Sequence, residues 1–408
     1  MVSVTEKIVS LSILIILLAL LIPISDTQQL NTRFTVSPAE APDYWPTEGW
    51  QQSTPQEQGM NATLLSKMID FSNNNWNLRS ILIIRNGYMV LENFIDSEYN
   101  ESSLTNTYSC TKSIISILVG IAIDKGYIDS IDESIVSFFP NRTIANLDSR
   151  KESITLKHLL SMTSGLDWDE SVQDQMKLES DWIQYTLDRP MAHTPSETWS
   201  YCGGGVHLLS SILNSTTGVS PLEFAETYLF HPLGISNYSW EIDAQGLEYG
   251  GGGLHLKPRD MVKIGFLCLN NGTWDAEQII SANWVANSTQ AYSSECDGGQ
   301  FSGQYGYLWW IKSSYKAYCA FGLNGQFIWV LPEYSLVIVM TANWYNPYEY
   351  LITDYILPSL GVFDYTTISS DTTTTTDADI IDPLILPVII GSGIAFAVVL
   401  VLVFMKRK

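Results

Sequence analysis

The segment from Ile114 to Ile123, IISILVGIAI, constrains the fold of the chain body most strongly, because it contains no charged residue. A helix that is apolar on all sides is stable only when neighbouring elements bury it. We therefore predict a helix at the centre of a folded domain. The chain has 408 residues, 46% of them hydrophobic, which is enough to build a core around such a helix.

The patterns on either side of this helix predict an α+β fold. Residues 61–75 have apolar side chains at helical spacing, and residues 80–94 form two apolar runs separated by Asn-Gly, a strong β-hairpin signal. Residues 108–245 are mostly helical in pattern, and short strand patterns return after residue 250. This order predicts an antiparallel sheet flanked by helices, with a largely helical inserted subdomain at about 108–245.

The N-terminal end of the chain is apolar. Ile8 to Ile24 is almost free of charge, follows Lys7 and precedes a polar stretch. This composition is typical of a secretory signal peptide, which we assign to residues 1–25. An uncleaved membrane anchor is the alternative.

The C-terminal end predicts a membrane anchor. Residues 383–405 are apolar over a length that crosses a bilayer as a helix, and the basic residues 406–408 follow directly, as expected of a cytoplasmic tail. A buried core helix is the alternative. The threonine-rich residues 366–382 predict an extended stalk. The body, residues 26–365, would then lie outside the cell on a single-pass anchor.

Seven Asn-x-Ser/Thr sequons agree with an extracellular body. They are Asn61, Asn100, Asn141, Asn214, Asn237, Asn271 and Asn287.

The chain has five cysteines, so at least one of them has no disulfide partner within the chain. Cys296 and Cys319 could close a loop in an oxidising exterior. Cys110 and Cys202 could pair with each other, or could be small buried residues without a role.

Ser109 and Lys112 lie just before the apolar helix, in the sequence YSCTKS. Side chains three residues apart on a helix are within reach of each other. A serine hydroxyl becomes a good nucleophile when a base takes its proton. A lysine can act as that base if burial or a nearby cation lowers its pKa well below the ordinary value of about 10.4. The alternative is that Ser109 is a helix N-cap and Lys112 a solvated residue of the first turn.

Four stretches together resemble the serine β-lactamases of class C type and the related esterases, D-peptidases and penicillin-binding proteins. In chain order they are YSCTKSIISILVGIAIDKGYI, ITLKHLLSMTSGLDWDE, GGGGLHLKPRDMVKIGFLCLNNGTW and FGLNGQFIWVLPEYSLVIVMTAN. The resemblance extends over about residues 54–345. It implies a β-lactamase/transpeptidase-like fold in residues 26–365, with Ser109 as the nucleophile and Lys112 as its base.

The family's second motif, Tyr-x-Asn or a looser tyrosine-centred variant, falls on WSYCGGG. The resemblance implies that Tyr201 lies opposite Ser109 and relays a proton to the leaving group. Gly203 stands where the family has Asn, which removes one polar contact to the substrate. A buried core tyrosine before a glycine turn is the alternative for Tyr201.

The family's third motif, Lys-Thr-Gly or His-x-Gly, aligns by its glycine with Leu323-Asn324-Gly325. Gly325 would let the strand approach the substrate, with Asn324 beside it. The resemblance implies that the backbone amides of Ser109 and Gln326 form the oxyanion hole. Leu323 provides no cation for a carboxylate, which favours a neutral ester or amide as substrate. The same stretch is also compatible with a plain hairpin turn.

The resemblance implies a serine hydrolase that acts through an acyl-enzyme on a small ester, amide or peptide, and the C-terminal end and the sequons predict that it is membrane-anchored and extracellular. The alternatives are a D-Ala-D-Ala-type peptidase or β-lactamase of the same fold, and a catalytically silent surface-binding protein. The resemblance implies no cofactor, and we expect no metal because the cysteines and histidines lack metal-ligand spacing. A net charge of −22 repels phosphate backbones, so we expect no nucleic-acid partner.

Overall fold

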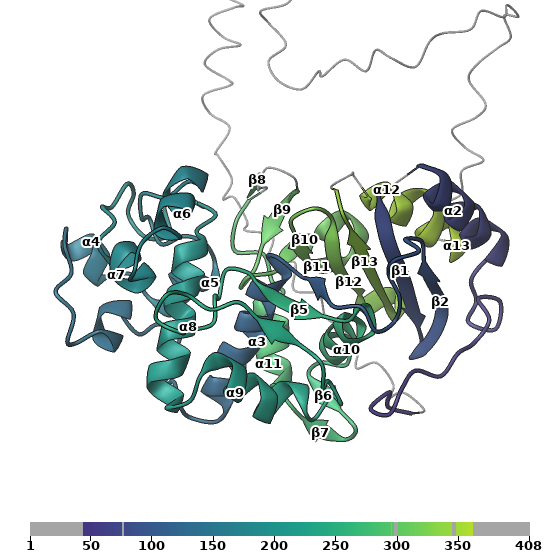
Figure 1. Ribbon diagram of the computed structural model, residues 1–408, viewed down its shortest axis with the longest axis horizontal. Coiled ribbons are helices and arrows are strands. Elements are labelled where there is room, and N and C mark those ends of the chain that lie inside the picture. The colour runs from purple at the N-terminus through teal and green to yellow at the C-terminus, as the bar shows by residue number, and fades with distance from the viewer. Residues whose placement is uncertain (1–43, 76, 295, 298–300, 345–347, 362–408) are drawn as a thin grey trace, which may run out of the picture. The chain divides into compact units, whose positions relative to one another are not determined.

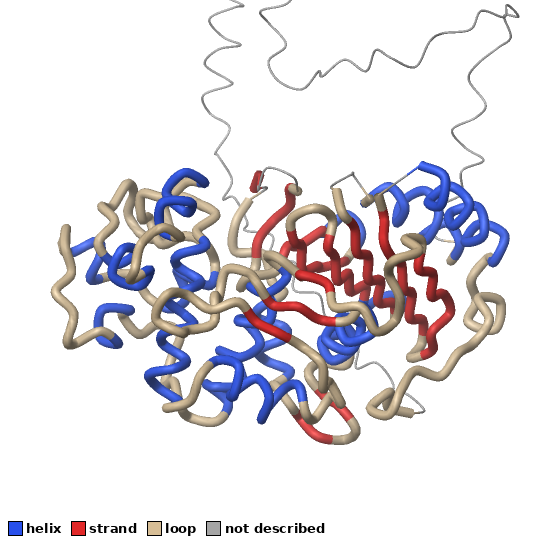
Figure 2. The backbone as a smooth tube through the Cα atoms, viewed as in Figure 1, coloured by secondary structure: helices blue, strands red, loops and turns tan. Residues whose placement is uncertain are grey.

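An antiparallel sheet and a group of helices lie next to each other in the computed structural model (Figure 1). Figure 2 shows the long strands gathered on one side and most of the helices on the other. The structure describes residues 44–75, 77–294, 296–297, 301–344 and 348–361.

The main sheet has eight strands in the order β2-β1-β13-β12-β11-β10-β9-β8. These strands are β1 (Leu78–Arg85), β2 (Tyr88–Phe94), β8 (Cys296–Asp297), β9 (Ser302–Tyr305), β10 (Trp310–Lys312), β11 (Ala317–Gly322), β12 (Gln326–Leu331) and β13 (Leu336–Ala342). A small sheet of order β3-β5-β4 contains β3 (Thr105–Asn106), β4 (Ser239–Trp240) and β5 (Leu254–Leu256), and a separate pair contains β6 (Thr273–Trp274) and β7 (Glu277–Gln278).

The helices form two groups in the sequence. The inserted helical part contains α3 (Cys110–Asp124), α4 (Ser149–Glu152), α5 (Leu156–Leu160), α6 (Glu170–Met176), α7 (Trp182–Leu187), α8 (Gly203–Thr217) and α9 (Pro221–Ala225). The remaining helices are α2 (Ala62–Asn75), α10 (Pro258–Leu269), α11 (Ala282–Ser288), α12 (Glu349–Leu351) and α13 (Leu357–Ser359). Of these, α10 packs on β1, β12 and β13.

The first and last strands of the domain pair with each other in the sheet. Ile81 of β1 lies opposite Met340 of β13, and Ile83 lies opposite Ile338, and all four side chains are fully buried. The helical part is therefore inserted between the N-terminal hairpin and the later strands. This confirms the predicted α+β fold with an antiparallel sheet and a largely helical insertion.

The predicted central helix is α3, and its burial is confirmed. All of its residues from Cys110 to Ala122 are buried. It packs against α8 of the helical part and against β11 of the sheet. Its N-terminal end thus lies where the two halves of the domain meet.

The disulfide between Cys296 and Cys319 that the sequence allows is not formed. Cys319 is a buried free thiol on β11, and Cys296 lies on β8, three strands away. Neighbouring strands are about 4.8 Å apart, so these strands are separated by roughly 14 Å, whereas a disulfide needs Cα atoms within about 7 Å. Cys110 and Cys202 are also buried thiols and do not pair. The Cys202 Sγ accepts a hydrogen bond from Gly205 N at 3.2 Å, which helps to cap α8.

The predicted signal peptide (1–25), stalk (366–382), membrane span (383–405) and tail (406–408) lie outside the described residues. Within the described ranges, no helix combines the length and the apolar composition that crossing a bilayer requires.

Candidate active site

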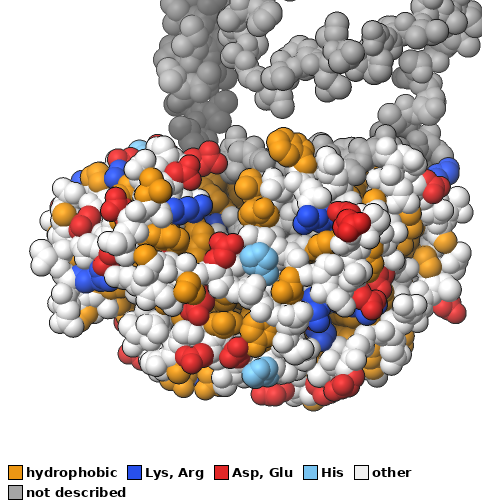
Figure 3. All heavy atoms as spheres, viewed as in Figure 1, with side chains coloured by type: hydrophobic (Ala, Val, Ile, Leu, Met, Phe, Trp, Pro, Cys, Tyr) orange, Lys and Arg blue, Asp and Glu red, His pale blue; other side chains and the backbone are white. Residues whose placement is uncertain are grey.

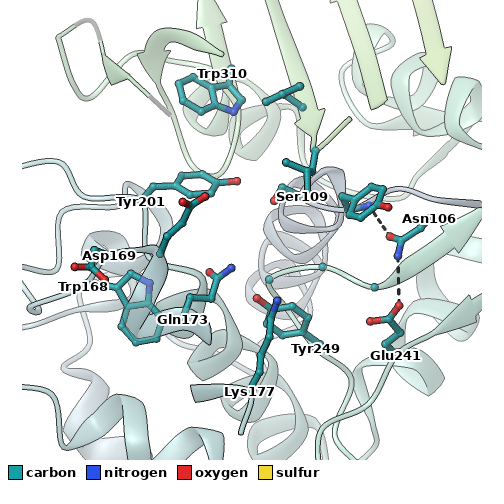
Figure 4. A pocket seen from close by; sticks show the side chains of 17 residues that line it. Asn106, Ser109, Trp168, Asp169, Gln173, Lys177, Tyr201, Glu241, Tyr249 and Trp310 are labelled. Carbon is teal, nitrogen blue, oxygen red and sulfur yellow. Dashed lines mark hydrogen bonds between the residues drawn. The ribbon is translucent and has the colours of Figure 1, made fainter. Parts of the chain in front are cut away.

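A cavity of about 460 Å³ lies at the N-terminal end of α3 (Figure 4). The cavity is lined by Asn106, Tyr108, Ser109, Trp168, Asp169, Glu170, Gln173, Lys177, Tyr201, Glu241, Tyr249, Gly251, Gly252, Gly253, Trp310, Phe321 and Leu323.

On the face of the molecule shown in Figure 3, acidic and basic side chains are interspersed with hydrophobic ones.

Ser109 and Lys112 come together as the nucleophile interpretation requires. Ser109 occupies the N-cap position of α3, but its hydroxyl makes no capping hydrogen bond. Instead, the Lys112 Nζ donates to Ser109 Oγ at 2.8 Å and to the carbonyl oxygen of Gly251 at 2.6 Å. Lys112 is only 2% exposed, so it is not a solvated residue of the first turn.

Burial, and to a smaller extent the positive charge of Lys177, lower the pKa of Lys112 to about 7. The amine therefore has a large neutral fraction near pH 7, in which its nitrogen can accept a proton. Burial and a nearby cation are the two causes that the sequence analysis required.

Tyr201 lies beside this pair, in the turn before α8. Its ring centroid is 4.8 Å from the Lys112 Nζ, and its hydroxyl hydrogen-bonds with Ser109. The ring stacks on Trp310 at a centroid distance of 6.2 Å. Burial raises the pKa of Tyr201, so the phenol keeps its proton. Because Tyr201 lines the cavity, it is not simply a core side chain.

The third motif is placed differently from the prediction. Asn324, Gly325 and Gln326 are all described, and none of them lines the cavity. Gln326 is 1% exposed, and its carboxamide bonds to the backbone of Ala342. The Asn324 Nδ2 donates to the hydroxyl of Tyr108, which lines the cavity, at 3.5 Å. The proposed oxyanion role of the Gln326 amide therefore has no support in the geometry.

Leu323 takes the place next to the cavity, because β11 ends at Gly322. A Cβ on Gly322 would lie 2.1 Å from the carbonyl oxygen of Thr107, so glycine allows β11 to approach the segment before Ser109. Both Leu323 and Ser109 line the cavity, and within the described ranges neither backbone N–H donates a hydrogen bond. The sequence has two glycines three residues apart, and it is Gly322, not Gly325, that directly precedes the residue lining the cavity.

Gln173 of α6 was missed by the sequence analysis. A Cβ on Gly203 would lie 2.1 Å from the Gln173 Oε1, so the Gln173 carboxamide fills the space that a side chain at position 203 would need. In Figure 4 this carboxamide points into the cavity between Tyr201 and Tyr249. Gln173 on α6 thus supplies a carboxamide near the place where the family's asparagine would stand at position 203. No local pattern in the sequence indicates this.

The cavity also contains charges of both signs. Asp169 caps α6 by accepting from Val172 N at 2.9 Å, and Glu241 accepts from Asn106 at 3.3 Å. The ammonium of Lys177 lies 5.9 Å from the centroid of the Tyr249 ring. A cation is therefore present in the cavity, although Leu323 does not provide it.

Among the described residues, no group of three or more His, Cys, Asp or Glu side chains is arranged to hold a metal ion.

The arrangement suits covalent catalysis at a carbonyl group. A serine hydroxyl bonded to a buried amine of lowered pKa is an activated nucleophile. A neutral phenol beside both groups can transfer a proton. Ser109 and Leu323, whose backbone N–H groups donate no hydrogen bond within the described ranges, line the same cavity. This fold and this site define a serine hydrolase.

Comparison with known proteins gives the family. The model of the family described as Beta-lactamase matches residues 80–362, more than half of the chain, and the chain belongs to the beta-lactamase family. The 6-aminohexanoate-dimer hydrolase of Paenarthrobacter ureafaciens is 23% identical over 297 residues, covering 66% of this chain and 73% of that protein.

Solved structures share the fold. A family VIII carboxylesterase has a TM-score of 0.62 at 16% identity, covering 76% of this chain and 99% of the other. The octameric penicillin-binding protein homologue from Pyrococcus abyssi has a TM-score of 0.58 at 20% identity, covering 74% and 77%. The expected β-lactamase/transpeptidase-like fold is confirmed.

Proposed function

We propose that the protein hydrolyses a small ester or amide through an acyl-enzyme on Ser109. The observation that carries this proposal is the 2.8 Å contact between the Lys112 Nζ and the Ser109 Oγ at a cavity wall. The Ser109 Oγ attacks the carbonyl carbon as the neutral Lys112 amine takes its proton. Tyr201 passes its proton to the leaving group and regains one from the Lys112 ammonium, which returns that amine to its neutral form. Water then attacks the acyl-enzyme, gives its proton to the neutral Lys112 amine, and the acid is released as Ser109 is reprotonated.

In this proposal, the backbone N–H groups of Ser109 and Leu323 stabilise the oxyanion. Both residues line the cavity, and both donors are available. Donors aimed at the developing negative charge contribute a large part of the rate in acyl transfer. Leu323 replaces Gln326 in this role.

The names of the relatives support an ester or amide bond as the target, since one relative is an amide-dimer hydrolase and a structural neighbour is a carboxylesterase. The test is turnover of p-nitrophenyl acetate and butyrate by the purified full chain. Saturable turnover that a fluorophosphonate blocks would support the proposal. A folded protein that neither turns over these esters nor reacts with the fluorophosphonate would favour a silent binding protein instead.

A second candidate is hydrolysis of a substrate that carries a carboxylate, such as a β-lactam or a D-Ala-D-Ala peptide. The observation in its favour is Lys177, which lines the cavity and can pair with an anion. Hydrolysis of nitrocefin, measured beside the neutral esters, decides between the two candidates.

We also propose that the enzyme faces outward from a membrane, anchored by residues 383–405. The basic residues 406–408 behind this apolar segment support the orientation. Of the seven sequon asparagines, five are exposed and Asn271 and Asn287 are partly exposed, which is compatible with glycan attachment. Deglycosylation of the cell-derived protein should then reduce its mass, and an unchanged mass would contradict this part of the proposal.

Substitution of Gln173 should affect substrates with an amide in the acyl group more than plain esters. In Q173A, kcat/KM for p-nitrophenyl N-acetylglycinate should fall about tenfold, because a hydrogen bond to the substrate amide is lost. Activity on p-nitrophenyl butyrate should change less than threefold, since that substrate makes no such bond.

The control for this prediction is a double variant. Q173A/G203N should recover much of the lost activity, because removal of the Gln173 side chain clears the two closest contacts of a Cβ at position 203 and leaves the Tyr249 hydroxyl, 3.1 Å away, to shift slightly. An equal loss on both esters, without recovery in the double variant, would show that Gln173 is structural.

A further inference from the structure

We infer that His207 and Asp243 are positioning residues for Lys112, acting through the glycine strap, which we define as residues 249–253. The inference rests on the proposed function, because it concerns the base of that reaction. Neither residue lines the cavity, and neither belongs to the motifs around Ser109, Tyr201 and Gly325.

The two side chains form a buried polar pair. The His207 Nε2 lies 3.0 Å from the Asp243 Oδ2, and the side chains are 0% and 1% exposed. The other carboxylate oxygen of Asp243 accepts from Gln245 N at 2.8 Å and from Leu247 N at 2.9 Å. Asp243 is therefore fixed by the turn that it closes. A buried polar pair costs free energy unless its hydrogen bonds are made, so its contacts should be specific.

The second nitrogen of His207 contacts the strap. Gly250 N donates a hydrogen bond to the His207 Nδ1 at 3.4 Å. A nitrogen that accepts from an N–H carries no proton, so the imidazole proton is on Nε2 and is donated to Asp243. The imidazole thus links a fixed carboxylate to the backbone of Gly250.

The residue after Gly250 in the strap contacts the base directly. The Gly251 carbonyl oxygen accepts from the Lys112 Nζ at 2.6 Å. Trp240 Nε1 donates to Tyr249 O at 3.0 Å and to Gly252 O at 3.2 Å, so hydrogen bonds hold the strap in place on both sides of Gly251. The Gly250–His207 bond fixes the peptide next to the acceptor of the lysine.

Packing holds the imidazole and the strap together. The rings of Trp182 and Tyr249 lie 5.3 Å and 5.7 Å from the His207 ring. A Cβ on Gly250 would lie 2.5 Å from Val206 O, so the strap lies directly against α8. Tyr201 lies two residues before the start of α8, so His207 connects the helix that follows Tyr201 to the peptide whose carbonyl group accepts from Lys112.

Two substitutions of His207 separate its two hydrogen bonds. In H207N the Asn Oδ1 can replace Nδ1, so the Gly250 bond is kept and the Asp243 bond is lost. In H207Q the Gln Nε2 can replace the ring Nε2, so the Asp243 bond is kept and the Gly250 bond is lost. If the strap positions Lys112, kcat for p-nitrophenyl butyrate should fall about 10- to 100-fold in H207Q, which loses the Gly250 bond itself, and about three- to tenfold in H207N, which loses only the Asp243 bond, with KM changed less than threefold in both.

The stability control is S80A, which removes a buried hydrogen bond of 2.6 Å between Ser80 and Thr341 in the strands β1 and β13. It should lower the melting temperature while kcat stays at the parent value. Equal kcat in the parent, H207Q, H207N and S80A would overturn the inference and leave His207 a structural residue.

D243N gives a second measurement if H207Q does not fold. The asparagine carboxamide has one accepting oxygen where the carboxylate has two. D243N therefore weakens either the bond to His207 or the bonds to Gln245 N and Leu247 N in the turn. We expect kcat to fall about three- to tenfold with KM unchanged. Unchanged kcat in a folded D243N would contradict the inference. A parent without any ester turnover would count against the proposed function and this inference together, whereas an active parent matched by both His207 variants would count against this inference alone.

Discussion

Replacement of Ser109 by alanine is expected to lower kcat/KM for p-nitrophenyl butyrate by about 10⁴-fold or more, because no acyl-enzyme can form without the nucleophile. The Lys112 amine would keep its hydrogen bond to Gly251, so the fold should be retained. The measurement is ester turnover by the full chain, combined with mass spectrometry of the fluorophosphonate adduct. In the parent the adduct should lie on the peptide that contains Ser109, and S109A should not be labelled.

The matched control is S116A, a second serine-to-alanine change on α3. Ser116 is fully buried and is not part of the cavity wall. It should retain activity within about threefold, because surrounding side chains and not its hydroxyl hold the helix in place. Labelling of S109A at the parent rate would assign the nucleophile to another residue. Equal loss in S109A and S116A would indicate a disturbed helix.

Replacement of Lys112 by methionine is the second large effect that we expect. Activity should fall about 10³- to 10⁴-fold, because the Ser109 proton then has no acceptor of suitable pKa. In the parent, kcat/KM should rise with pH through about 7, since burial lowers the pKa of Lys112 to about 7 and only the neutral amine accepts a proton. A rate that falls with rising pH over this range would exclude Lys112 as the base.

The same substitution should stabilise the protein. The pKa of Lys112 is about 7 in the folded state and near its ordinary value of 10.5 in the unfolded chain. Below pH 7 both states are protonated and the buried charge destabilises the fold fully; this destabilisation decreases between pH 7 and 10.5, where only the unfolded state holds the proton. Loss of two hydrogen bonds offsets part of the gain, so K112M should increase the free energy of unfolding by roughly 2 kcal/mol at pH 6.

Thermal or urea unfolding at pH 6 and pH 9 measures this difference. The gain in K112M should be clearly smaller at pH 9 than at pH 6. The control is K67M, which changes an exposed lysine on α2 and should affect stability little at either pH. A K112M variant that is less stable than the parent at pH 6 would show that Lys112 is not a buried cation held at a cost to the fold.

The sequence alone determined those features that depend on the spacing of side chains within one element. The uninterrupted apolar run predicted the buried helix α3, and Asn86-Gly87 between apolar strands predicted the hairpin of β1 and β2. The three-residue spacing of Ser109 and Lys112 predicted their contact for the same reason, since one turn of helix fixes it. The order of elements also predicted the antiparallel sheet with a helical insertion.

The tertiary structure alone decided which residues from distant elements surround that contact. Gly322, not Gly325, ends β11 at the cavity, because the strand end is set by pairing with β12 and by contact with Thr107. Gln173 fills the space beside Gly203, and His207 reaches Gly250 across a fold that brings α6, α8 and the glycine strap together. Local spacing carries no information about these neighbours, because packing between elements far apart in the chain determines them, and the same packing sets the pKa of Lys112.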